Sequence, residues 1–320
     1  MSHRSTYYLA ALCAALLLPA TALAQEQLAA KPKAATGQKP AAAAARPAFR
    51  QIISGVFQTV PADMRAEEAT SVHDVVELLV NTPNIHWKPN LNPSSRTLKE
   101  LATATTFRRT SFGFEFSFKT PRMIWVDVPQ PSGKMQRKLI WYLLYQVKNP
   151  GGQIITVEQP DGTYRAETIQ EPVRFEPHFV LESLEYKKAY LDRLIPVAVE
   201  AIRKREDSAR PLLNSVEIAA KPIPVSSERL DNSVWGVATW EDVDSRIDFF
   251  SIYVQGLSNA YKWGDPPGAY KQGDPPGTGR VFAYKTLRLN FWRPGDEFVE
   301  DQREIRFGIP GKVDSEWIYR

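Results

Sequence analysis

FGFEFSF at residues 112–118 and KLIWYLLYQVK at residues 138–148 are the two stretches that decide the fold. The first alternates phenylalanine with small or polar residues, which places four rings on one face of a strand. The second is apolar on both faces for most of its length, as is typical of a central strand in a sandwich. NPGG at residues 149–152 ends it with a turn signal. Together they predict a β-sheet core.

Similar strand patterns recur along the rest of the chain. They lie at residues 123–128, 154–157, 163–168, 173–181, 214–219, 234–240, 247–256, 281–292 and 304–309. Many short strands separated by turn signals favour a sandwich or barrel over a parallel sheet. We therefore expect a mainly β protein with minor α, built as two immunoglobulin-like β-sandwich domains with helical inserts.

Helical patterns interrupt the strands in two places. Residues 72–79 carry apolar side chains at helical spacing, and Ser71 is the expected N-cap of that helix. A second helix follows Asp192, its expected cap, and has Pro196 in its first turn, where a missing N–H is tolerated. We interpret this second helix as the connection between the two halves of the chain.

The first 24 residues predict export. Arg4 precedes an apolar run over residues 8–18, and Ala-Leu-Ala at residues 22–24 forms a small-residue cleavage pattern before Gln25. The apolar run is too short to span a bilayer. We therefore expect a cleaved signal peptide, a mature chain without a transmembrane segment, and a periplasmic, cell-surface or extracellular location.

The basic charge of the chain lies in the segment after the signal peptide. Residues 25–50 carry a net charge of +4 and Arg4 adds +1, so that the whole-chain value of +4 leaves −1 for residues 51–320. Alanine, proline and lysine dominate residues 25–48, which predicts a disordered tether. The tether is a spacer or a weak electrostatic contact to an anionic envelope surface. A near-neutral folded part without a basic, aromatic-rich stripe argues against nucleic-acid binding.

We expect the following organisation. It comprises a signal peptide at residues 1–24, the tether at 25–48, a β-rich domain with N-terminal helices at 49–185, a connecting helix at 186–211, and a β-sandwich domain at 212–320. The last domain contains the sequence GDPPG twice, at residues 264–268 and 273–277. This content of proline and glycine predicts a long loop over residues 262–280, and loops of that length are commonly functional.

Four aromatic residues around this loop are candidate ligand-binding residues: Tyr261, Trp263, Tyr270 and Trp292. Exposed flat rings on a rigid sheet suit contacts with sugars or peptides. The alternative is that these rings anchor the loop or fill the core, which is the usual role of aromatic residues in a sandwich.

An acidic group is a candidate calcium site. Asp242, Asp244 and Asp248 lie between two predicted strands, and carboxylate oxygens are ligands that calcium prefers. Their spacing matches no calcium motif, and the alternative is a solvated turn whose charges protect a sheet edge. Because the only cysteine is Cys13 and the histidines are far apart in the sequence, we expect no zinc site.

The chain contains no Gly-x-Ser-x-Gly elbow, dinucleotide-binding fingerprint or phosphate-binding loop. We therefore expect a non-enzymatic exported protein that binds another envelope component, protein or glycan, through loops of its second β domain. Two alternatives stay open. One is a hydrolase that acts on an envelope polymer with Asp and Glu carboxylates. The other is a structural component of a surface layer.

Overall fold

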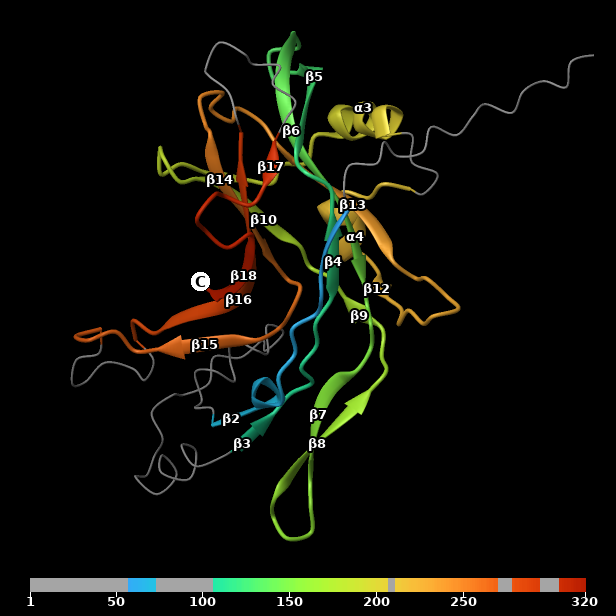
Figure 1. Cartoon of the computed structure of the whole chain (residues 1–320), viewed down its shortest axis with the longest axis vertical. Coiled ribbons are helices and arrows are strands. Elements are labelled where there is room, and N and C mark those ends of the chain that lie inside the picture. Colours follow the sequence, from blue (N-terminus) through green and yellow to red (C-terminus); the bar gives the residue numbers. More distant parts are fainter. Residues whose placement is uncertain (1–56, 73–105, 207–210, 270–277, 294–304) are drawn as a thin grey trace, which may run out of the picture. The chain divides into compact units, whose positions relative to one another are not determined.

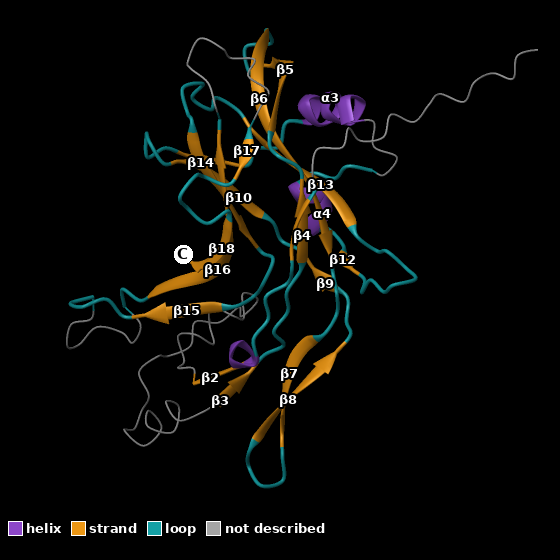
Figure 2. Cartoon of the chain, viewed as in Figure 1, coloured by secondary structure: helices purple, strands orange, loops and turns teal. Residues whose placement is uncertain are grey.

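The computed structural model describes residues 57–72, 106–206, 211–269, 278–293 and 305–320. Strands dominate this part of the chain, and the paired strands run antiparallel (Figure 2), so the prediction of a mainly β protein is confirmed. All described residues belong to one unit, Phe49–Arg320. The predicted signal peptide and tether lie outside the described residues.

One sheet is built around a long strand, β6 (Figure 1). β6 (Met135–Lys148) pairs with β13 (Val234–Trp240), β5 (Arg122–Pro129) and β4 (Glu115–Phe118), and β4 pairs in turn with β1 (Gln58–Val60). These pairings confirm the strands predicted near the centre of the chain.

A second sheet is centred on β14 and β16. Its strands are β11 (Ala189–Leu191), β10 (His178–Ser183), β14 (Phe249–Gln255), β16 (Val281–Trp292), β15 (Tyr261–Gly264), β17 (Arg306–Phe307) and β18 (Ser315–Tyr319). Of the strand predicted at residues 304–309, only β17 is observed among the described residues.

Smaller elements complete the described part of the chain. They are the pairs β2 (Thr70–Val72) with β3 (Thr106–Arg108), β7 (Gln153–Glu158) with β8 (Tyr164–Ile169), and β9 (Val173–Arg174) with β12 (Pro222–Ile223), the 3-10 helix η1 (Ala66–Ala69), and the helices α3 (Pro196–Glu206) and α4 (Ser215–Ala219). None of the helices in the described ranges is long and apolar enough to cross a membrane.

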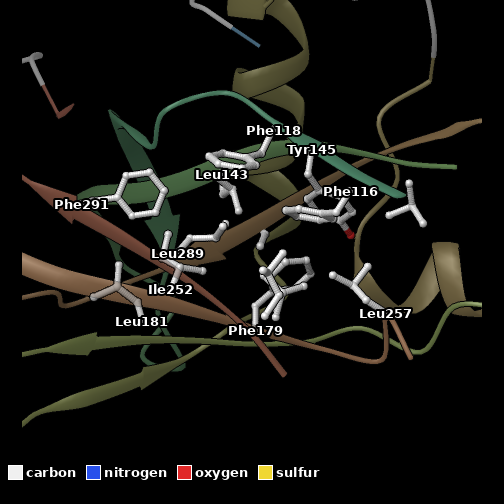
Figure 3. Close-up of a cluster of buried hydrophobic side chains, with 14 of the residues drawn as sticks. Phe116, Phe118, Leu143, Tyr145, Phe179, Leu181, Ile252, Leu257, Leu289 and Phe291 are labelled. Atoms are coloured by element: carbon white, nitrogen blue, oxygen red, sulfur yellow. The ribbon is translucent and has the colours of Figure 1, made fainter. Parts of the chain in front are cut away.

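The two sheets share one hydrophobic core. Phe116 and Phe118 from β4 face Phe179 and Ile252 of the second sheet across this core (Figure 3), and the rings of Phe116 and Phe179 are 6.3 Å apart. The alternation predicted for residues 112–118 is thereby confirmed as a source of core rings. Each fully buried side chain of this size contributes about 1.5–3 kcal/mol.

This core contains residues from both predicted halves, and β13 of the second half pairs with β6 of the first. The expected boundary at residues 186–211 therefore does not divide the core. The division into two immunoglobulin-like sandwich domains is not confirmed.

The strand predicted at residues 214–219 is wrong, because this segment forms helix α4. The Asn214 side chain accepts hydrogen bonds from the backbone N–H groups of Val216 and Glu217. The Glu217 carboxylate accepts the N–H of Asn214 in return, at 3.0 Å. This capping box satisfies the free donors of the first turn and starts a helix despite the β-branched residues that follow.

A helix is observed within the predicted connecting segment, as α3, but it begins at Pro196 and Asp192 is not its cap. The Asp192 carboxylate instead accepts the backbone N–H of Thr239 at 2.8 Å and the hydroxyl of Ser215. The other predicted helix falls largely on residues 73–105, which lie outside the described residues. Its expected first residues belong to strand β2.

Candidate functional site

The hairpin formed by β15 and β16 carries an aromatic face. Tyr261 pairs with Tyr284 and Trp263 with Phe282, and residues directly opposite each other in an antiparallel pair point to the same side. The ring of Tyr261 lies 6.0 Å from that of Phe282 and 6.1 Å from that of Tyr284. Trp263 and Tyr284 are each 36% exposed. We call these four residues the aromatic face.

The same pairing corrects the predicted loop at residues 262–280. Residues 262–264 belong to strand β15, because they pair with residues 281–283 of β16 in the second sheet (Figure 1). Trp263 is therefore held on a strand, and binding groups on strands are positioned better than groups on loops.

A pocket of about 360 Å³ adjoins this hairpin, and we call it the hairpin pocket. Tyr261, Trp263 and Tyr319 supply its aromatic walls. Its charged lining comes from β15 and from segments close to η1 and β3, namely Arg65, Glu67, Glu68, Arg109 and Lys262. The pocket therefore combines flat apolar surfaces with charges of both signs.

Cations lie over the rings of the hairpin pocket. The guanidinium carbon of Arg109 is 4.2 Å from the ring centre of Tyr261, and the Nζ of Lys262 is 4.2 Å from that of Tyr319. Such contacts contribute about 0.5–1 kcal/mol at exposed sites. They fix the orientation of the rings and keep two cations at the pocket.

Trp263 is held by Arg280, the residue that precedes β16. The guanidinium carbon of Arg280 lies 3.7 Å from its ring centre. Arg280 also bonds Asp265 through two parallel contacts of 2.8 and 2.9 Å, and these hydrogen bonds lower the pKa of the Asp265 carboxyl. Arg280 therefore links Asp265, in the proline- and glycine-rich sequence, to the ring of Trp263.

A buried ion pair underlies the hairpin pocket. Lys285 is 1% exposed, and its Nζ lies 2.6 Å from Glu68 Oε1 and 3.0 Å from Asp63 Oδ2. The Tyr319 hydroxyl donates a hydrogen bond to Glu68 Oε1 at 3.1 Å. Burial and the Glu68 charge raise the pKa of Tyr319 to about 12, so it stays protonated at neutral pH. Glu68 is therefore neutralised by its partners.

The remaining charges of the pocket are less fully paired. Within the described part of the chain, neither Arg109 nor Lys262 forms an ion pair with a carboxylate, and Glu67 forms none with a cation. Arg109 donates from Nε to the carbonyl oxygen of Glu68 at 2.7 Å, while its buried Nη1 has no hydrogen-bond partner among the described residues. Glu67 and Lys262 are exposed and are therefore available to a ligand with polar or charged substituents.

The structure brings together two of the four predicted aromatic residues. Tyr261 and Trp263 line the hairpin pocket, whereas Trp292 lies at the far end of β16, about 27 Å from Tyr284 at about 3.4 Å per residue. Trp292 is half-buried there, and the Arg306 guanidinium carbon is 5.0 Å from its ring centre. Tyr270 lies outside the described residues.

Two of the three predicted calcium ligands are engaged by cations. Asp242 pairs with Lys138 at 2.9 Å, and Asp244 pairs with Arg246 at 2.9 Å. Hydrogen bonds from Arg246 hold the pKa of Asp244 well below its usual range. Across the described ranges, no three His, Cys, Asp or Glu side chains, Asp248 included, form a group that could hold a metal ion. The structure thus does not bring the three aspartates together as ligands.

Two other pockets are larger. One, of about 680 Å³, lies between the β5–β6 turn and the start of α3, where Lys138 and Arg193 both pair with Glu241. The other, of about 450 Å³, is lined by Tyr284 of the aromatic face together with His178. The hairpin pocket differs from the first because two of its cations, Arg109 and Lys262, form no ion pair with a carboxylate in the described part of the chain.

Sequence reasoning missed Arg109, Tyr319 and the two rings of β16 that complete the aromatic face. The alternation of Phe282 and Tyr284 was a usable signal, but the pairing with β15 was not visible in the sequence.

Comparison of the chain with protein families, with curated proteins and with solved structures finds no match.

Proposed function

We propose that this chain is an exported, non-enzymatic protein that binds another component of the cell envelope at the β15–β16 hairpin. The observation that carries the proposal is the aromatic face beside a pocket in which two cations, Arg109 and Lys262, form no ion pair with a carboxylate of the described residues. The signal pattern at residues 1–24 and the tether at residues 25–48 support the export part. Neither an immunoglobulin-like topology nor a division into two domains is needed for this site.

The hairpin suits recognition for two physical reasons. Exposed aromatic rings offer a large apolar contact area at a low cost in side-chain entropy, since each has only two rotatable bonds. The cations over Tyr261, Trp263 and Tyr319 restrict the rings further before any ligand arrives. A surface that is ordered in advance loses less free energy on binding.

The binding role is tested by co-sedimentation of the purified protein with insoluble envelope fragments at low and high salt. We expect the wild-type protein to pellet at both salt concentrations, because contacts to rings are not screened by ions. Trp263→Ala should weaken binding by about tenfold or more, as is usual for a central aromatic contact. Tyr164→Ala is the matched control, since Tyr164 is 42% exposed and lies on β8, outside the hairpin.

Each other result changes the conclusion. A wild-type protein that stays in the supernatant contradicts the binding role, and equal pelleting of all variants contradicts the site. Binding that disappears at high salt reduces the interaction to electrostatic attraction. Release of soluble fragments from the pellet favours the hydrolase alternative. Export is checked by N-terminal sequencing of the protein recovered outside the cytoplasm, which should begin at Gln25.

A further inference from the structure

We infer that the chain forms a two-fold symmetric dimer in which strand β8 of one copy pairs with β8 of a second copy. This interface lies outside the β15–β16 hairpin and is independent of the binding function proposed for it. Three features of β8 carry the inference: its open edge, the direction of its free backbone groups, and the order of its charged side chains.

β8 is an edge strand that is open on its outer side. β7 and β8 form a two-stranded sheet of their own (Figure 1), and residues 164–168 are all exposed. In the described part of the chain, the backbone of β8 pairs with that of β7 alone. An isolated pair of strands is only marginally stable, and an open edge is a template for another strand. A second copy of β8 would extend this sheet to four strands.

The backbone groups that β8 leaves free belong to every second residue. The N–H and C=O groups of Ile154 both bond Ser111, at 2.8 Å, on the side of β7 away from β8. Ile154 therefore exchanges no hydrogen bonds with Thr168 opposite it, and the N–H and C=O of Thr168 point away from β7. Because this direction alternates along a strand, the groups of Ala166 and Tyr164 also point outward. These three residues each offer a donor and an acceptor to a second strand.

The charged side chains of β8 are complementary to those of a second copy. Antiparallel pairing about Ala166 places Arg165 opposite Glu167 twice, because the two-fold axis repeats each contact. The same register brings the outward backbone groups of the two strands together. A shift by two residues in either direction puts Arg165 opposite Arg165 or Glu167 opposite Glu167, which is unfavourable. Within the described ranges neither side chain forms an ion pair, so both are available to the second copy.

The size and symmetry of this contact define the assembly. Each copy contributes one strand of six residues, which makes a small interface, so we expect a weak dimer in equilibrium with the monomer. A contact in which both copies use the same surface about a two-fold axis is closed. Pairing of β8 with β8 therefore ends at the dimer and does not extend into a filament or layer.

The experiment is sedimentation equilibrium of the purified full chain over a range of concentrations, which should show a monomer–dimer equilibrium. Arg165→Glu should raise the dimer Kd about tenfold or more, because carboxylates then face each other at both symmetric positions. The exchange variant Arg165→Glu/Glu167→Arg restores both pairs of opposite charge and should return the Kd to within about threefold of the wild-type value. Lys312→Glu is the matched control, since it makes the same change in net charge at an exposed cation outside β8 and should behave as wild type.

A second variant tests the backbone hydrogen bonds. Ala166→Pro removes the outward N–H at the centre of the interface and none that pairs with β7, so the dimer should be lost. Tyr164→Ala changes no charge and no backbone group, and should keep the Kd within about threefold of wild type. Thermal unfolding of each variant shows that the fold is kept.

Several results would overturn the inference. A wild-type chain that stays monomeric up to its highest soluble concentration contradicts the dimer. Equal dimerisation of wild type, Arg165→Glu and Ala166→Pro contradicts the assignment to β8. An exchange variant that dimerises no better than Arg165→Glu contradicts the register about Ala166. Species larger than a dimer contradict the closed two-fold contact.

Discussion

At the scale of single residues, Glu206 is the buried charge on which the attachment of α3 depends. Its carboxylate accepts a hydrogen bond of 2.7 Å from the Tyr142 hydroxyl and pairs with Lys119 at 3.2 Å and Arg122 at 3.1 Å. Lys119 is itself buried, and burial lowers its pKa. The carboxylate is therefore the partner that compensates a desolvated ammonium group.

Glu206→Gln should destabilise the protein by about 3–5 kcal/mol at neutral pH, because the change removes the carboxylate of a buried ion pair with Lys119. The free energy of unfolding in urea is the measurement. Glu200→Gln is the control, since Glu200 lies on the exposed side of the same helix and pairs with Arg203 at the surface. An equal effect of both changes contradicts the role of the buried pair.

Glu206 also predicts how stability depends on pH. Burial alone would raise its pKa, but the Tyr142 hydrogen bond and the charges of Arg122 and Lys119 outweigh it and lower the pKa below the ordinary 4.5. A group with a lowered pKa contributes its stabilisation above the unfolded-state pKa and loses it as the pH falls through the folded-state value. The stability difference between wild type and Glu206→Gln should therefore shrink as pH falls below about 4. A constant difference in urea titrations from neutral to acidic pH contradicts this cause.

At the scale of elements, α4 depends on its cap. The helix has five residues and buries Ile218, so it is too short to be stable without its terminal hydrogen bonds. Asn214→Ala should lower the free energy of unfolding by about 1 kcal/mol, whereas Asn214→Asp, which keeps the accepting oxygen, should have a smaller effect. Equal unfolding midpoints in urea for wild type and Asn214→Ala would show that packing of Ile218 alone holds the helix.

The elements differ in how well the sequence predicts them, and a comparison of β13 with α4 shows why. β13 was predicted with its observed bounds because most of its residues are apolar and favour strands. Residues 214–219 contain Val216 and Ile218 and resemble a strand, but hydrogen bonds of the cap outweighed that preference. The aromatic face could not be predicted, because it depends on which residue of β16 lies opposite Tyr261. Register is set by tertiary contacts in a long hairpin.

At the scale of the whole described fold, the site joins segments that are distant in the sequence. Tyr261 and Trp263 were predictable from their place beside the GDPPG repeat. Arg109 and Glu68 precede them by more than a hundred residues and reach the hairpin only through the packing of η1 and the buried Lys285 pair. The candidate ring residues were thus partly visible in the sequence, whereas the charges of the hairpin pocket were not.

The shared core makes a prediction for unfolding. Because strands from both predicted domains pair with one another and bury their side chains in clusters that contain residues of both halves, neither half has a core of its own among the described residues. Residues 49–320 should then unfold in a single cooperative transition, with a calorimetric enthalpy equal to the van't Hoff enthalpy. Differential scanning calorimetry of the full chain is the measurement. Two separate transitions, or a van't Hoff enthalpy near half the calorimetric value, would support the two-domain division instead. In that case the pairing of β13 with β6 would be a contact between domains and not part of one cooperative core.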